Sequence, residues 1–137
     1  MGILIDASVL IEHERGRLNV SRLLEGFGEG EGFLSAITAS EMLHGVHRAQ
    51  DPAVHARRMA SVEALLAVFP MLPIDKTVAR VHASLWAHLA QAGTPVGAHD
   101  MWIAATCLAG GHALVTANLR EFSRVPGLAV HCPTPPT

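Results

Sequence analysis

Aromatic side chains are scarce in this sequence, which contains no tyrosine, two tryptophans and four phenylalanines. Aromatic rings that stack on bases are a common means of holding single-stranded nucleic acids. With so few rings available, the sequence argues against recognition of bases mainly by stacking. Charged residues are also few, at 16%, and the formal net charge of -2 argues against a polycation of the histone kind.

Cysteine and long apolar runs are equally scarce. The two cysteines, Cys107 and Cys132, form no Cys-x-x-Cys pair, which is typical of a reduced protein without disulfides. No apolar run reaches about 18 residues, so no transmembrane helix is expected. Asp6 and Glu12 interrupt the first apolar stretch and no basic residues precede it, which argues against a secretion signal. These absences together predict a cytoplasmic protein.

Half of the residues are apolar, and the 137-residue chain is long enough for one domain, spanning 1–137, with a substantial core. Nine of the ten basic residues are arginine. Arginine suits planar contacts with phosphate better than lysine does, although a biased genome composition explains the same excess. A local basic patch is therefore compatible with the slightly negative net charge.

Short apolar segments alternate with longer amphipathic ones along the chain. Strands are expected at 3–6, 33–37, 69–74, 113–116 and 128–131. Helices are expected at 9–15 with Ser8 as cap, at 18–28, from Thr38 or Ser40 to 49, at 53–68 after Pro52, at 76–91 with Asp75 as cap, and from His99 or Asp100 to 109, with a turn at 118–127. This alternation predicts an α/β fold, with a central parallel sheet flanked by helices on both faces.

Three acidic residues stand at the starts of different apolar segments. Asp6 follows Ile-Leu-Ile, Glu41 lies at the start of the third expected helix, and Asp100 begins the last one. In a parallel sheet the ligand crevice lies beyond the carboxyl ends of the strands, so these acids are expected to converge there. Three carboxylates within about 4 Å would repel by roughly 4 kcal/mol per pair. A divalent cation removes that repulsion, and oxygen ligands without cysteine favour Mg²⁺ or Mn²⁺ over zinc.

Four motifs in this order resemble the PIN-domain ribonucleases, and among them the VapC toxins of bacterial toxin–antitoxin pairs. The matching segments are Asp6-Ala7-Ser8, residues 40–45 (SEMLHG), residues 95–100 (PVGAHD) continuing into Ile103-Ala104, and residues 115–122 (VTANLREF) with 124–128 (RVPGL). The resemblance covers almost the whole chain. It implies a PIN fold, Mg²⁺-dependent cleavage of RNA that leaves 3′-hydroxyl and 5′-phosphate ends, and a VapB-type antitoxin that blocks the site.

The sequence departs from this family at one position. Many PIN domains carry a fourth acid after the last central strand, where this chain has Asn118. The nearest acid is Glu121, which either supplies the missing charge or forms a surface pair with Arg120 or Arg124. Asn118 can instead hold a metal-bound water or a substrate oxygen, so the presence of a second metal ion stays open.

Further roles follow from the positions of polar residues near the expected rim. Asp6 and Asp100 are expected to bind Mg²⁺, with Mn²⁺ as a substitute, while Glu41 orients the attacking water or a second ion. Ser8 and Thr116 are expected to hold the carboxylates in orientation. Arginines steer the RNA phosphates, with Arg120 and Arg124 the best placed, followed by Arg15 and Arg17. Scarce aromatics then imply that specificity depends on RNA shape.

Simpler explanations exist for each of these residues. Asp6 and Asp100 could be turn or capping residues, and Glu41 could merely complement a helix dipole. A structural zinc site from Glu41, His44 and His47 is a rival, although its spacing is not that of the metalloprotease motif. His99 is either a substrate contact or a solvated loop residue.

Two other classes of protein share these features. One is a catalytically silent RNA-binding module, which metal-dependent cleavage would distinguish from an enzyme. The other is an interaction protein that captures a partner peptide, for which an apolar face on the helices expected at 53–68 and 76–91 would serve. The same faces suit homodimerisation. Trp86, Met101 and Trp102 are expected in the core or at such an interface.

Overall fold

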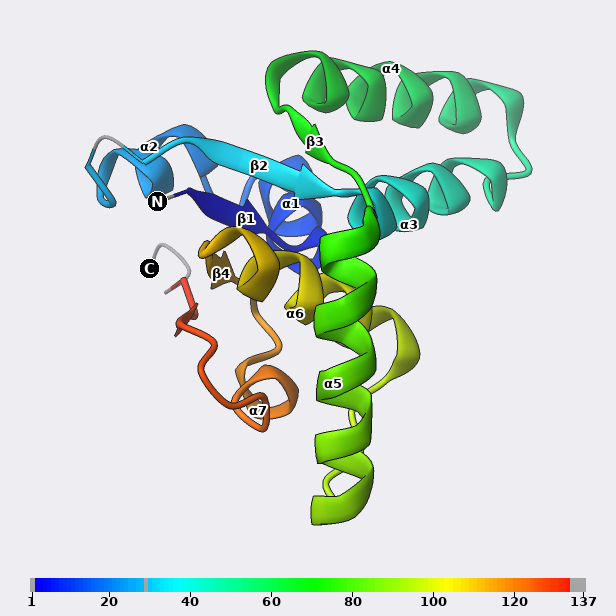
Figure 1. Cartoon of the computed structure of the whole chain (residues 1–137). Coiled ribbons are helices and arrows are strands. Elements are labelled where there is room, and N and C mark those ends of the chain that lie inside the picture. The colour runs from blue at the N-terminus through cyan, green and yellow to red at the C-terminus, as the bar shows by residue number, and fades with distance from the viewer. Residues whose placement is uncertain (1, 29, 134–137) are drawn as a thin grey trace.

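The computed structural model describes residues 2–28 and 30–133 of the chain (Figure 1). Five parallel strands form one sheet in the order β3-β2-β1-β4-β5. The strands are β1 (Ile3–Ile5), β2 (Gly32–Ser35), β3 (Met71–Leu72), β4 (Ala113–Val115) and β5 (Val130–His131). All five expected strands are present in parallel pairing, so the α/β prediction is confirmed, although each strand is shorter than expected.

Helices connect the strands or follow them. They are α1 (Ala7–Glu14), α2 (Val20–Glu25), α3 (Ala36–His47), α4 (Pro52–Val68), α5 (Lys76–Ala92), α6 (Ala98–Gly110) and the short α7 (Leu119–Phe122). The helix α7 lies inside the segment that was expected to be a turn. No helix in this described part of the chain is both long enough and apolar enough to cross a membrane.

The first residues of the helices show which capping residues were predicted correctly from the sequence. Asp75 caps α5 by accepting the Val78 N–H, as predicted, and Pro52 occupies the first turn of α4. The start of α3 was predicted wrongly, because Ser35 rather than Thr38 or Ser40 caps it. Ser8 was also wrong as a cap: α1 already begins at Ala7, and the Ser8 hydroxyl bonds elsewhere.

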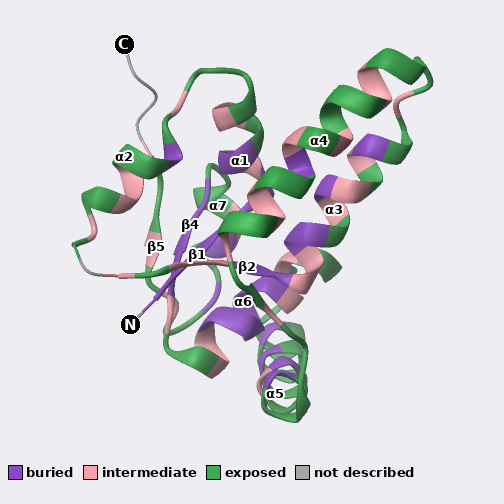
Figure 2. Cartoon of the chain, turned by 90° about the horizontal axis from the view of Figure 1, so that it is seen from above, coloured by how far each residue is buried: buried purple, intermediate pink, exposed green. Residues whose placement is uncertain are grey.

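Helices cover both faces of the sheet, as the alternation of side chains along β1 requires. Ile3 and Ile5 pack into one apolar core with residues of α1, α3 and α4, whereas Leu4 points to the other face, into a core with α5 and α6. Figure 2 shows the central strands and much of α6 as buried. Strands buried on both sides read as continuous apolar runs, which is why Ile-Leu-Ile marks β1.

The register of the strands brings their carboxyl ends to one edge of the sheet. Ile5 of β1 pairs with Val115 of β4, so Asp6 and Thr116, the residues that follow, leave the sheet side by side. β1 and β4 are neighbours at the point where the strand order changes direction: β2 and β3 follow on one side of β1, and β5 follows on the far side of β4. Such a point opens a crevice for ligands in parallel sheets.

One side chain of the helix α7 enters the apolar core formed with α5 and α6, which gives a test of the fold near this edge. Phe122 is fully buried, whereas Leu119 on the same helix is 45% exposed. We expect Phe122→Ala to lower the free energy of unfolding by about 3–5 kcal/mol, because it leaves a cavity. Leu119→Ala, the control, should change it by less than about 1 kcal/mol. Equal effects of the two changes in urea melts would contradict this packing.

Candidate active site

Asp6 is held at the carboxyl end of β1 by two hydroxyl groups. It is 7% exposed, and its Oδ2 accepts hydrogen bonds from Ser8 Oγ and Thr116 Oγ1, both at 2.8 Å. Asp6 is the residue before α1, but its side chain makes no capping bond. The interpretation of Asp6 as a mere helix cap therefore fails, because its carboxylate is turned toward β4 and not toward the helix N–H groups.

The two hydroxyls also fix the loop after β4. Ser8 Oγ accepts the Ala117 N–H at 3.0 Å, and Thr116 Oγ1 accepts the Asn118 N–H at 3.0 Å. Through these bonds Asp6 and Ser8 are fastened to a segment more than a hundred residues away in sequence. The contacts restrain the orientation of the Asp6 carboxylate.

Glu41 lies in the second turn of α3, because that helix begins earlier than the sequence suggested. A helix dipole acts mainly within the first turn, so complementing the dipole does not explain this acid. Its Oε1 is buried and has no hydrogen-bond partner among the described residues. Burial, together with the charge of Asp6, raises the pKa of Glu41, while nearby His99 lowers it. A buried acceptor without a donor is costly unless a ligand or ion satisfies it.

Asp100 is the third residue of α6, so the expectation that His99 or Asp100 begins this helix was wrong. Gly97 is the residue at the cap position, and no side chain caps the helix. Burial, and next the charge of Glu121, raise the pKa of Asp100 from 3.8 to about 6, with smaller contributions from Asp6 and Glu41. The four acids therefore act on one another, and the ionised form of Asp100 is disfavoured in the metal-free protein.

Residues of α7 and its flanks hold the loop that precedes Asp100. The Gly97 N–H donates to Glu121 Oε1, and this bond is the main reason that the pKa of Glu121 is lowered. Asn118 Nδ2 donates to Glu121 Oε2 at 3.3 Å and to Asp100 Oδ2 at 3.4 Å. Arg124 Nη1 donates to the Pro95 carbonyl at 2.7 Å. Both ends of the loop 95–97 are therefore tied to the α7 segment.

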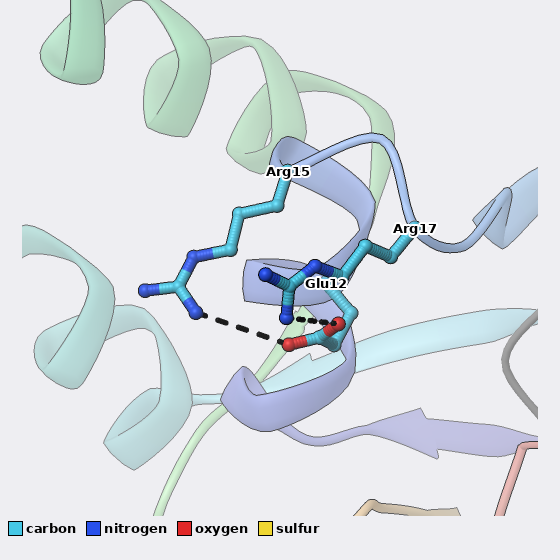
Figure 3. A network of polar contacts seen from close by, with 3 residues as sticks. All are labelled: Glu12, Arg15 and Arg17. Carbon is cyan, nitrogen blue, oxygen red and sulfur yellow. Dashed lines mark ion pairs between the residues drawn. The ribbon is translucent and has the colours of Figure 1, made fainter.

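The four candidate arginines differ in their surroundings. Arg124 is engaged with Pro95, whereas Arg120 is exposed on α7. Arg15 and Arg17 lie at the end of α1, where both approach Glu12 (Figure 3). The structure thus places Arg124 beside the loop 95–97, Arg120 on the exposed surface of α7, and Arg15 and Arg17 just beyond α1.

The acids share one region but do not form a closed cage. No three Asp, Glu, His or Cys side chains within residues 2–28 and 30–133 are close enough together to enclose a metal ion. The residues nevertheless fit a hard cation. Their donors are carboxylate oxygens, and one of these, Glu41 Oε1, lacks a hydrogen-bond partner within the same residues. Burial first, and then the charges of neighbouring acids, raise the pKa values of Glu41 and Asp100.

The rival zinc site is not supported. His44 and His47 are exposed, and the His47 ring lies against that of His55 with centroids 5.8 Å apart. His99 is exposed as well, at the start of α6.

The residues expected in the core or at an interface fall into three environments. Met101 is buried, Trp102 stacks on His82 with ring centroids 3.5 Å apart, and Trp86 is 61% exposed. Trp86 is therefore not a core residue, and an interface is the environment that stays open to it.

Sequence reasoning missed the residues whose role depends on long-range contacts. Gly97 and Pro95 were seen only as parts of a motif, although they are the points at which the α7 segment holds the loop. A Cβ at Gly97 would lie 3.1 Å from Glu121 Oε1, so a side chain there would press on this contact. The only sign of this role in the local sequence was a glycine placed just before a helix whose first turn carries an acidic residue.

Comparisons with known proteins identify the family of the chain. The PIN domain family matches residues 3–128 of the chain. Ribonuclease VapC1 of Rickettsia felis is 32% identical over 130 residues, covering 95% of both chains. The tRNA(fMet)-specific endonuclease VapC of Salmonella typhimurium is 35% identical over 117 residues, covering 85% of this chain and 80% of the relative.

Solved structures show the same fold. A chain in the crystal structure of DNA-bound VapBC from Salmonella typhimurium superposes with a TM-score of 0.86 at 28% identity, covering 96% of this chain and 98% of that one. A chain of VapBC2 from Rickettsia felis, bound to a DNA fragment from its promoter, gives a TM-score of 0.88 at 19% identity, covering 98% and 100%. The motifs, the sheet and these relatives agree that the chain belongs to the PIN-domain family, in its VapC branch.

Proposed function

We propose that the protein, acting as one PIN domain, is a metal-dependent endoribonuclease and the toxin of a VapBC-type toxin–antitoxin pair. The observation that carries this proposal is the convergence of Asp6, Glu41 and Asp100 at the carboxyl edge of the sheet, with Glu41 Oε1 buried and without a partner in the described chain. Relatives over nearly the full length are named as ribonucleases.

Asp6, Glu41 and Asp100 are the residues that would hold the cation. Mg²⁺, with Mn²⁺ as substitute, suits them because all three offer hard oxygen donors. When bound, the cation supplies Lewis-acid polarisation of the phosphodiester and lowers the pKa of a coordinated water. Asp6 is preoriented by its two hydroxyl partners, and Glu41 Oε1 has acceptor capacity to orient the attacking water.

In this mechanism Asn118 and Glu121 act mainly by holding other residues of the site in place. Both oxygens of Glu121 already accept hydrogen bonds, from Gly97 and Asn118, and its lowered pKa reflects those donors. The Asn118 amide links Glu121 to Asp100. We therefore assign to this pair the placement of the loop 95–97 and of Asp100, and not the binding of the first metal ion.

An antitoxin and a second copy of the chain are the proposed protein partners. Structural relatives include VapBC complexes. Exposed apolar side chains suited to such contacts lie at Val68 at the end of α4, at Met71 of the edge strand β3 and at Trp86 of α5. An antitoxin arginine near the three acids would replace the cation electrostatically. A silent interaction module remains the second candidate, which a cleavage assay separates.

Cleavage of RNA is the first test of this function. The purified protein should cut RNA in Mg²⁺ or Mn²⁺, lose activity in EDTA and regain it when metal is restored, because the acids alone supply no electrophile. Transfer RNA is the first substrate to try, since a relative is named for tRNA(fMet). Asp6→Asn should reduce the rate at least about a hundredfold. Activity that survives thorough chelation would contradict the metal mechanism, and a lack of any activity would favour the interaction module.

Removal of one charge from the acid cluster is the second test. In EDTA at about pH 7.5, Asp100→Asn should raise the free energy of unfolding by about 1 kcal/mol, or the melting temperature by roughly 3–5 °C. The reason is that burial and the neighbouring acids raise the pKa of Asp100 from 3.8 to about 6, so its ionisation destabilises the folded state increasingly above about pH 3.8 and in full above about pH 6. The gain should shrink as the pH falls through about 6 and vanish only below about pH 3.8, where the carboxyl is protonated in the unfolded state as well.

The same variant should lose cleavage at least about a hundredfold, together with the stabilisation that Mg²⁺ gives the wild type. Asp75→Asn is the matched control, because it removes an equal charge from the cap of α5, where asparagine caps equally well. An Asp100→Asn protein that melts no higher in EDTA, yet keeps its cleavage and its Mg²⁺ shift, would remove Asp100 from the site.

A further inference from the structure

A groove of about 410 Å³ runs from the acid site along α1. Ser8 and Ala117, which are hydrogen-bonded to each other, line it at the start of α1, and Glu12, Arg15 and Arg17 line it toward the end of that helix and beyond. Apolar residues, among them Ile11 and Leu18, complete the lining. Ser8 Oγ donates to Asp6 at 2.8 Å, so one end of the groove adjoins the carboxylate that would hold the cation. Cavities of roughly 300–1,000 Å³ are typical of small-ligand sites, which gives room here for a nucleotide unit.

The far end of the groove carries two arginines paired with one acid (Figure 3). Arg15 Nη1 lies 4.0 Å from Glu12 Oε1, and Arg17 Nη1 lies 3.6 Å from Glu12 Oε2. Gly16 adopts a left-handed conformation with φ of 73°, which lets the chain turn back after α1 and brings Arg17 to the same carboxylate. Two guanidinium groups and one carboxylate leave a local excess of one positive charge.

These ion pairs are loose enough to exchange. The side chains of Arg15 and Arg17 are 61% and 64% exposed, while that of Glu12 is 31% exposed. Exposed pairs of this kind contribute little to stability, so an incoming phosphate can displace the carboxylate with little loss of free energy. Phosphate also offers guanidinium groups a geometry that permits two parallel hydrogen bonds.

We infer that this groove binds the RNA strand next to the cleaved bond, with Arg15 and Arg17 exchanging Glu12 for a flanking phosphate. The inference rests on the proposed function. It adds to that function a subsite for RNA, and it identifies Glu12 as the carboxylate that competes with phosphate for the two arginines. The path from Ser8 to Arg15 advances about 10 Å along the helix, so the phosphate involved is a neighbour of the reacting one. The accessible apolar side chains of the groove, Ile11 and Leu18, would pack against sugar and base without reading sequence.

Binding of labelled single-stranded RNA in EDTA tests this inference without cleavage. Glu12→Gln should tighten binding about three- to tenfold at low salt, because the internal competitor is gone. Glu14→Gln is the matched control: it removes the same charge from the same helix, and no ion pair within the described residues includes Glu14. An equal gain in both variants would show a general charge effect and overturn the exchange.

Replacing the two arginines should have the opposite effect and weaken the binding of RNA. Arg15→Gln/Arg17→Gln should weaken binding at least about tenfold and reduce the slope of log affinity against log salt by about 1.4, or about 0.7 for each phosphate that is no longer neutralised. Arg57→Gln/Arg58→Gln is the control, with the same charge change on exposed residues of α4. Equal weakening in the two double variants, or unchanged binding in the first, would overturn the inference.

Two further results separate this inference from the proposed function. If the wild type cleaves RNA in Mg²⁺ but the groove variants bind and cleave as it does, the function stands and the groove assignment fails. If the Arg15→Gln/Arg17→Gln protein loses binding to an antitoxin while binding RNA normally, the groove belongs to the protein partner and the inference is again wrong. A wild type that neither binds nor cleaves RNA overturns both. All variants alter exposed or half-exposed side chains, and melting curves should confirm that they fold.

Discussion

Burial of several carboxylates beside one another at the carboxyl edge of the sheet, with the repulsion between them, is the constraint on which the site depends. Asp6 is buried and restrained by two hydroxyls, Glu41 has a buried oxygen without a partner in the described chain, and the pKa of Asp100 is raised to about 6. The fold supplies the opposing restraint, since hydrogen bonds from Ser8 and Thr116 fasten Asp6 to the loop after β4. The protein thus gives up stability to keep these acceptors in place.

Much of this arrangement could be predicted from the sequence, because it depends on local patterns. Ile-Leu-Ile before Asp6 marks a strand buried on both faces, and Asp75 before an amphipathic segment marks a helix start; the structure contains both. In a parallel sheet, residues that follow strands meet at one edge, so Asp6 and Thr116 could be placed together from the strand assignments alone.

The remainder depends on contacts that no local pattern encodes. Whether Glu121 is a ligand or a positioning residue turns on its bond with Gly97, 24 residues away. The start of α3 was misjudged because Ser35, at the end of a strand, also serves as a cap, and this moved Glu41 from the first turn into the second. The pairing of Glu12 with both Arg15 and Arg17 requires the left-handed turn at Gly16, which the sequence pattern did not reveal.

Proton release on metal binding tests the central claim most directly. If a cation is held by Asp6, Glu41 and Asp100, its binding near pH 6 must displace the proton from Asp100, whose pKa is raised to about 6. Calorimetric titration with Mn²⁺, in buffers of different ionisation enthalpy, should show protons released near about pH 6 and fewer near about pH 8. Metal binding without this pH dependence, or no binding at all, would contradict the account.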